Sequence, residues 1–94
     1  MNPVEIALRE ILARHTHREP SAILPGLHLE RDLHLRPLEL VLVALDVEEM
    51  AGIEVPLREL ASKSSVGELF TFLSNLVFHR ATRLEMYTSM RARN

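Results

Sequence analysis

Apolar residues recur every three or four positions in three separate stretches of the chain, a spacing that predicts three amphipathic helices. The first helix is predicted over residues 3 to 15. The second is predicted from Pro37 to Met50, ended by Gly52. The third follows Ser65-Val66-Gly67-Glu68, a capping-box pattern. Neither glycine nor proline recurs after Gly67, so the third helix is predicted to run far toward the C-terminus, with residues 79 to 94 as a helical extension.

The segment between the first two helices breaks the helical pattern. Residues 16 to 36 contain Pro20, Pro25 and Gly26, which prevent a continuous helix. A loop of this length is uncommon unless its own side chains pack it down. The residues available for that packing are Ile23, Leu24, Leu27, Leu29, Leu33 and Leu35. Residues 56 to 61 are predicted to form one short helical turn, which completes a single all-α domain over residues 1 to 94.

The second helix is apolar on two opposite faces. Its first face, predicted to point into the core, consists of Leu40, Val43, Ala44, Val47 and Met50. Its second face consists of Leu38, Val41, Leu42 and Leu45. An exposed aliphatic stripe on a small domain usually marks an interface. The alternative is that the C-terminal extension folds back and covers the second face.

Composition limits the possible functions. The 94 residues include no cysteine, which excludes a disulfide framework and thiolate chemistry. The N-terminus becomes charged and amphipathic within ten residues, unlike a signal peptide. No apolar run approaches the roughly 20 residues that a membrane span needs. We therefore expect a soluble, cytoplasmic protein.

Charge is distributed unevenly although the net charge is only −2. Residues 30 to 60 hold eight acids against three arginines, whereas residues 79 to 94 hold four arginines against Glu85. An acidic middle argues against nucleic acid as the partner and favours a basic protein surface. The basic end is interpreted as a solvated helical face.

Three blocks of the sequence resemble the acyl carrier protein family at matching spacing. They are Asp32-Leu33-His34-Leu35-Arg36-Pro37-Leu38 with the helix after it, Gly52-Ile53-Glu54-Val55-Pro56, and Ser64-Ser65-Val66-Gly67-Glu68. The resemblance needs no gap and covers about two thirds of the chain. It implies an antiparallel four-helix bundle, with three main helices and one short one, and a long packed loop between the first two. In that family the first block reads Asp-Leu-Gly-x-Asp-Ser-Leu, and its serine carries phosphopantetheine.

The attachment chemistry is absent at the corresponding positions. Pro37 occupies the position of the serine and Arg36 that of the preceding aspartate. Proline has no hydroxyl to carry the cofactor, but it is favoured in the first turn of a helix. The other serines lie outside an Asp-Ser-Leu setting. They are Ser21, Ser62, Ser64, Ser65, Ser74 and Ser89. We therefore expect no cofactor.

The histidines do not indicate a metal or catalytic site. His15 and His17 form a His-x-His pair, with His28 and His34 in the following segment. A zinc site needs three or four converging ligands, and no cysteine is present to help. No nucleophile or pair of catalytic carboxylates accompanies them. We expect surface loop histidines, no metal and no enzymatic activity.

The leading hypothesis is an acyl-carrier-protein-like domain, related to fatty acid biosynthesis, that has lost its attachment site and acts by protein–protein contact through the second helix. The expected partner has a basic or apolar docking surface and is either an acyl-carrier-dependent enzyme or a second copy of the chain; neither nucleic acid nor a membrane is expected. The predicted partner-binding residues are Leu38, Glu39, Val41, Leu42, Leu45, Asp46 and Glu49. Two alternatives remain open. One is a working carrier in fatty acid or polyketide-type metabolism loaded at an unexpected residue, and the other is a non-covalent lipid binder.

Overall fold

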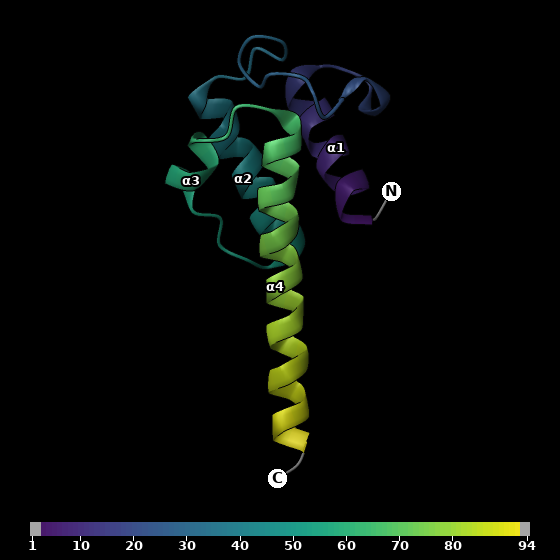
Figure 1. Ribbon diagram of the computed structural model, residues 1–94, viewed down its shortest axis with the longest axis vertical. Coiled ribbons are helices and arrows are strands. Elements are labelled where there is room, and N and C mark those ends of the chain that lie inside the picture. The colour runs from purple at the N-terminus through teal and green to yellow at the C-terminus, as the bar shows by residue number, and fades with distance from the viewer. Residues whose placement is uncertain (1–2, 93–94) are drawn as a thin grey trace.

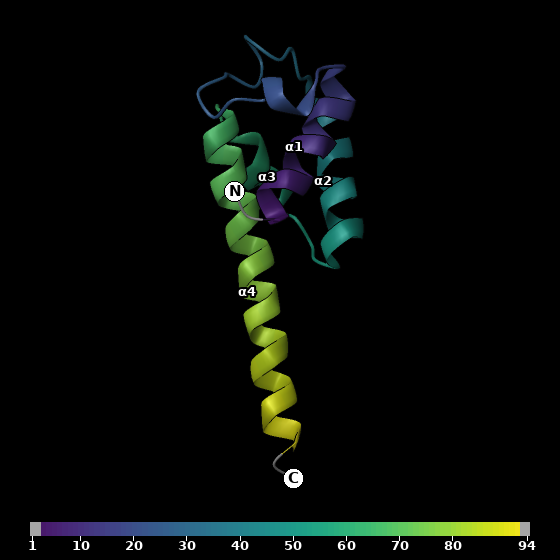
Figure 2. The same ribbon diagram turned by 90° about the vertical axis from the view of Figure 1, so that its right-hand side faces the viewer.

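The computed structural model describes the backbone of residues 3–92 and the side chains of residues 3–79, and over this range the protein is all-α. Four helices and one short 3₁₀ turn follow one another without a strand in the described range (Figure 1). They are α1 (Pro3–Thr16), η1 (Pro20–Ala22), α2 (Pro37–Ala51), α3 (Leu57–Ala61) and α4 (Val66–Ala92). Helix α1 packs against both α2 and α4 and lies between them in Figure 2. The predicted fold class and helix order are confirmed.

The boundaries of α2 follow from local chemistry at both ends. Pro37 is the first helical residue, and Arg36 precedes it in an extended conformation. A guanidinium has no acceptor with which to cap the helix. Instead the Glu39 carboxylate reaches back and accepts the Arg36 backbone N–H at 3.1 Å. At the other end Gly52 adopts a left-handed φ of 65° and donates its N–H to the Glu48 carbonyl, which ends the helix as predicted.

Helix α4 begins with a modified form of the predicted capping box. The Ser65 hydroxyl oxygen accepts the Glu68 backbone N–H at 3.2 Å, as the pattern requires. The Glu68 carboxylate accepts the N–H of Ser64 at 3.0 Å, one residue earlier than in the usual box. Both contacts satisfy backbone donors near the start of a 27-residue helix.

The long loop is packed down across one end of the bundle. Its buried side chains are Ile23, Leu29, Leu33 and Leu35, whereas Leu24 is exposed, contrary to its expected role in packing. Backbone hydrogen bonds of 2.9 Å join the loop to the start of α4, among them the Val66 N–H to the Leu27 carbonyl and the Gly67 N–H to the Pro25 carbonyl. A Cβ on Gly67 would lie 3.2 Å from the Pro25 oxygen, so glycine permits this close approach.

One hydrophobic core joins α1, the loop and the other three helices. Val43 and Val47 of α2 are buried, as predicted for the inner face, and they share the core with Leu8, Leu69 and Leu73. Leu40 packs against this core half-buried. The prediction was wrong for Met50, which is 44% exposed. The turn at Gly52 brings Val55 back into the core, so the final turn of α2 lies outside it.

Helix α4 continues beyond the bundle as a single projecting helix (Figures 1 and 2). The alternative in which the C-terminal extension folds back over α2 is therefore wrong within residues 3–92, because α4 stays one helix through Ala92. The side chains of Leu84 and Tyr87, two apolar residues of the extension, lie outside the described residues. Within the described part of the chain, no helix has both the length and the apolar character needed to cross a membrane.

Candidate functional site: the start and outer face of α2

The first functional position is Pro37, which lies exposed at the start of α2. It borders a cavity of about 460 Å³ between the long loop, α2 and α3. Buried Leu29, Leu35 and Leu60 contribute to its apolar lining. The polar lining residues are His28, Glu30, Ser62, Lys63 and Ser64. The structure thus places an apolar recess, open to a polar rim, beside the residue at the expected attachment position.

The residues at this position do not fit a phosphopantetheine group attached through a phosphodiester. Pro37 offers no hydroxyl oxygen. Two serines line the same cavity, but the Ser62 hydroxyl donates to the Glu59 carbonyl at 2.6 Å. Ser64 is exposed, and its backbone groups hold the loop and Glu68 in place. Both serines are exposed, and the described difference between their hydroxyls is the hydrogen bond of Ser62.

The second functional feature is the outer face of α2, here called the α2 stripe: Leu38, Val41, Leu42 and Leu45. Leu38 is 69% exposed, Leu42 40% and Leu45 52%. Val41 is half-buried and lines the cavity near Pro37. The predicted separation of α2 into a core face and an exposed apolar face is confirmed. No other described part of the chain covers the three leucines.

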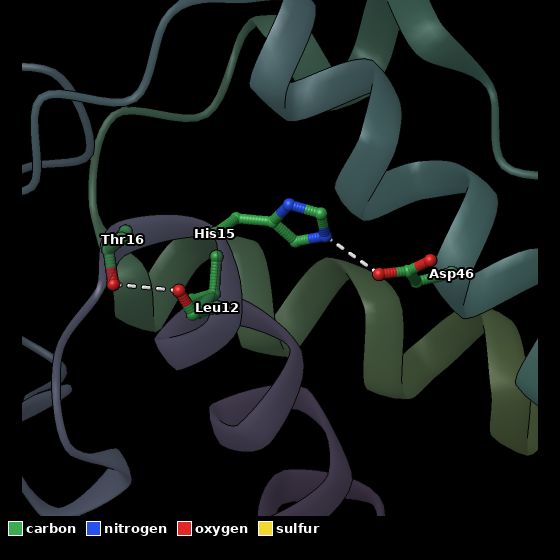
Figure 3. A network of polar contacts seen from close by, with 4 residues as sticks. All are labelled: Leu12, His15, Thr16 and Asp46. Carbon is green, nitrogen blue, oxygen red and sulfur yellow. Dashed lines mark hydrogen bonds and ion pairs between the residues drawn. The ribbon is translucent and has the colours of Figure 1, made fainter.

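The acids of α2 make different contacts. The Asp46 carboxylate lies 2.7 Å from Nε2 of His15, a contact that joins α2 to the end of α1 (Figure 3). Glu48 accepts the Val55 backbone N–H at 2.7 Å. Glu49 is exposed, and no ion pair joins it to another described side chain. Glu49 is thus the α2 acid with its carboxylate free for a partner.

The expectation that His15 is a surface loop residue was wrong. Helix α1 extends to Thr16, whose hydroxyl donates to the Leu12 carbonyl at 2.7 Å, so His15 lies in the last helical turn (Figure 3). There it is half-buried against Asp46. His-x-His spacing carried no signal for this contact, because its partner is 31 residues away in the sequence. Among the side chains that the structure describes, no cluster of three or more potential metal ligands occurs.

Comparison with known proteins places these features in a family. No protein-family model matches the chain. The meromycolate extension acyl carrier protein of Mycobacterium leprae is 32% identical over 69 residues, which are 73% of this chain and 60% of that protein. Proteins of the same name from Mycolicibacterium aurum and Mycolicibacterium smegmatis are each 30% identical over 69 residues, covering 71% and 70% of their lengths. This chain belongs to the acyl carrier protein family.

Family membership agrees with the all-α bundle and with the prediction that the chain is not an enzyme, since the relatives are named as carriers. The match spans only about three fifths of the Mycobacterium leprae protein. The cavity beside Pro37 was not predicted, because its lining comes from three segments that meet only in the folded chain. The apolar residues of the loop and the family resemblance at Asp32 to Leu38 were the sequence signals that pointed to this end of the bundle.

Proposed function

We propose that this acyl carrier protein family member no longer carries phosphopantetheine and acts through the outer face of α2 on a protein partner. The observation that carries the proposal is the coexistence of Pro37 at the first position of α2 with an exposed apolar stripe along the same helix. The hydroxyl that the family uses is absent, whereas the surface that would meet a partner is present. The functional unit is the single domain of residues 1 to 94.

The composition of the surface indicates the kind of partner. The stripe supplies apolar area, and Glu49 supplies a free negative charge next to it. Glu39 and Asp46 add negative charge, although they also contact Arg36 and His15 within the chain. Charges at the edge of an interface mainly steer association and set specificity. A partner with a basic rim around an apolar patch fits this surface, and an acyl-carrier-dependent enzyme is our proposed example.

The relatives are named for meromycolate extension, which supports a role related to fatty acid biosynthesis. Absence of cysteine suits a reducing compartment, and we place the function in the cytoplasm. In that setting a carrier-like protein without an acyl group would occupy or regulate an enzyme that normally meets a loaded carrier.

Incubation with coenzyme A and a broad-specificity phosphopantetheinyl transferase tests the lost attachment. We expect the intact mass to remain that of the unmodified 10.7 kDa chain. The matched control is Arg36→Asp combined with Pro37→Ser, which restores the Asp-Ser-Leu motif and should gain one phosphopantetheine. Loading of the wild type would contradict the proposal. If the wild type loads and Ser64→Ala prevents it, the chain is a working carrier loaded at an unexpected residue.

Partner binding is tested separately by titrating purified acyl-carrier-dependent enzymes with the wild type, Leu42→Glu and Leu24→Glu. Leu24 is also an exposed leucine, but it belongs to the long loop and not to α2. We expect Leu42→Glu to weaken binding at least about tenfold, equivalent to about 1.4 kcal/mol, and Leu24→Glu to leave it unchanged. If the two variants changed the binding affinity equally, the partner would not bind specifically through α2.

The cavity beside Pro37 favours a second candidate function, the non-covalent binding of a fatty chain. Its volume of about 460 Å³ lies within the usual range for small-molecule sites. The lining combines buried leucines with Lys63 at the polar rim, which suits an acyl chain with an acidic head group. Native mass spectrometry with fatty acids tests it. Leu60→Trp, which fills the cavity, should abolish a bound species if the fatty chain occupies this site.

A further inference from the structure

The last part of α4, residues 80–92, projects beyond the rest of the bundle. This segment is here called the α4 extension. It leaves the bundle as one helix (Figures 1 and 2), and the molecule measures 53 × 27 × 19 Å as a result. Its 13 residues are within the length at which an isolated helix is only marginally stable in water. The extension continues a helix that is already packed in the bundle, and a surface that packs against it would supply the tertiary contacts from which most helical stability in proteins comes.

The total surface of the chain leaves enough area for such a contact. Its accessible area is 6597 Å², whereas a compact monomer of this mass exposes about 5,500 Å². The radius of gyration is 14.6 Å, whereas about 12 Å is expected for a compact domain of this length. The excess area of roughly 1,100 Å² per chain is similar to the roughly 800 Å² that each partner buries in a standard interface.

Helix α2, which carries the stripe, and the α4 extension have opposite charge. Between Pro37 and Ala51 the chain has four acids and neither lysine nor arginine. The α4 extension has three arginines and one glutamate, interspersed with Leu84, Met86, Tyr87 and Met90. Their lengths also match, since 15 and 13 helical residues span about 22 and 20 Å. An acidic helix with an exposed apolar face and a basic helix rich in apolar residues are therefore suited to pair.

This pairing cannot form within one molecule, because α4 carries the extension away from the bundle (Figure 2). Two molecules packed side by side in opposite directions can form the pairing, because each places its α4 extension beside the bundle of the other. A two-fold axis makes the two contacts identical and closes the assembly at two chains. Opposite charges in each contact favour association, and their attraction weakens as salt screens it.

We propose that the partner of the α2 stripe is the α4 extension of a second copy, in a reciprocal two-fold dimer. The inference deepens the proposed function and rests on it, since both require the α2 stripe to be a protein-contact surface. In the dimer each stripe is covered once, by the extension of the other copy, so that two identical contacts form. An acyl-carrier-dependent enzyme that uses the same surface competes with dimerisation.

Sedimentation equilibrium of the full chain tests the dimer. The wild type is expected to reach twice its 10.7 kDa mass, with a dissociation constant that rises when NaCl increases from about 0.05 to about 0.5 M. Leu42→Glu and Arg83→Glu should each raise that constant at least about tenfold. Their matched controls are Leu24→Glu and Arg31→Glu, which make the same changes at exposed loop positions and should leave it unchanged. Circular dichroism checks that every variant stays helical.

A photo-crosslinking amino acid at position 42 identifies the contacting segment directly. Mass spectrometry of the crosslinked dimer should find residues 80–92 of the second copy. A concentration-independent monomer would overturn the dimer, and so would a dimer that Leu42→Glu leaves intact, which is the result expected if two extensions pair with each other. In either case the enzyme titration described above still decides the proposed function on its own.

Discussion

The two faces of α2 are built from the same kind of residue and have opposite surroundings. On the inner face Val43, Ala44 and Val47 are at most 1% exposed, whereas on the outer face Leu38 and Leu45 are more than half exposed. The inner residues contact α1 and α4 through one continuous core. On the outer face Leu38, Leu42 and Leu45 are exposed, and Val41 is half-buried beside the cavity. Aliphatic character alone therefore does not distinguish a residue that stabilises this fold from one that is available to bind.

The largest difference in stability between variants of the two faces should come from introducing the same negative charge on each face. Val47→Asp places a carboxylate where the side chain is fully buried, and an unpaired buried charge costs several kcal/mol. A domain of this size is stable by only roughly 5–14 kcal/mol. We expect Val47→Asp to unfold the domain or nearly so, and Leu45→Asp to change stability by no more than about 0.5 kcal/mol. Urea denaturation measures both, and similar losses would show that the two faces are not distinct.

A milder comparison removes methyl groups. Val43→Ala leaves a small cavity in the core, for which we expect a loss of about 1–3 kcal/mol. Leu45→Ala removes more carbon atoms but from an exposed position, so its cost should be smaller. Thermal unfolding of the two variants provides the measurement. An unchanged melting temperature for Val43→Ala would mean that the inner face had been assigned wrongly.

The smallest effect is expected at the edge between the faces, where Asp46 contacts His15. Both side chains are partly exposed, at 30% and 21%, so the net contribution of this contact should be about 0.5–1 kcal/mol. A double-mutant cycle with His15→Ala and Asp46→Ala isolates it from the other effects of each substitution. A coupling energy of zero would mean that the contact with His15 does not stabilise the fold, and that the Asp46 carboxylate is available to a partner.

Much of this architecture was predictable because it depends on local signals. Proline at position 37, glycine at position 52 and Ser65 with Glu68 mark helix ends through conformations and hydrogen bonds that involve neighbouring residues. The division of α2 into two faces follows from helical periodicity alone. Met50 satisfies the same periodicity but is exposed, because the core ends before the last turn of α2. Where the core ends depends on how the segment after Gly52 turns back toward it, which periodicity does not contain.

The features that escaped prediction depend on tertiary contacts or unusual local choices. His17 ends α1 with a left-handed φ of 55°, a conformation for which glycine is the usual signal, so the helix end was placed one residue early. The His15–Asp46 contact and the cavity beside Pro37 join segments distant in sequence. That Pro37 occupies the position of an attachment site was inferred from the family resemblance. Helical periodicity alone could not have indicated it.

The central claim is that this protein uses the surface of an acyl carrier without carrying the cofactor. The most direct test is the intact mass of the protein isolated from the cells that produce it, where the natural transferase and coenzyme A are present. We predict a single species at the unmodified mass of 10.7 kDa. A species heavier by one phosphopantetheine, with the modification mapped to any serine of the chain, would contradict the claim.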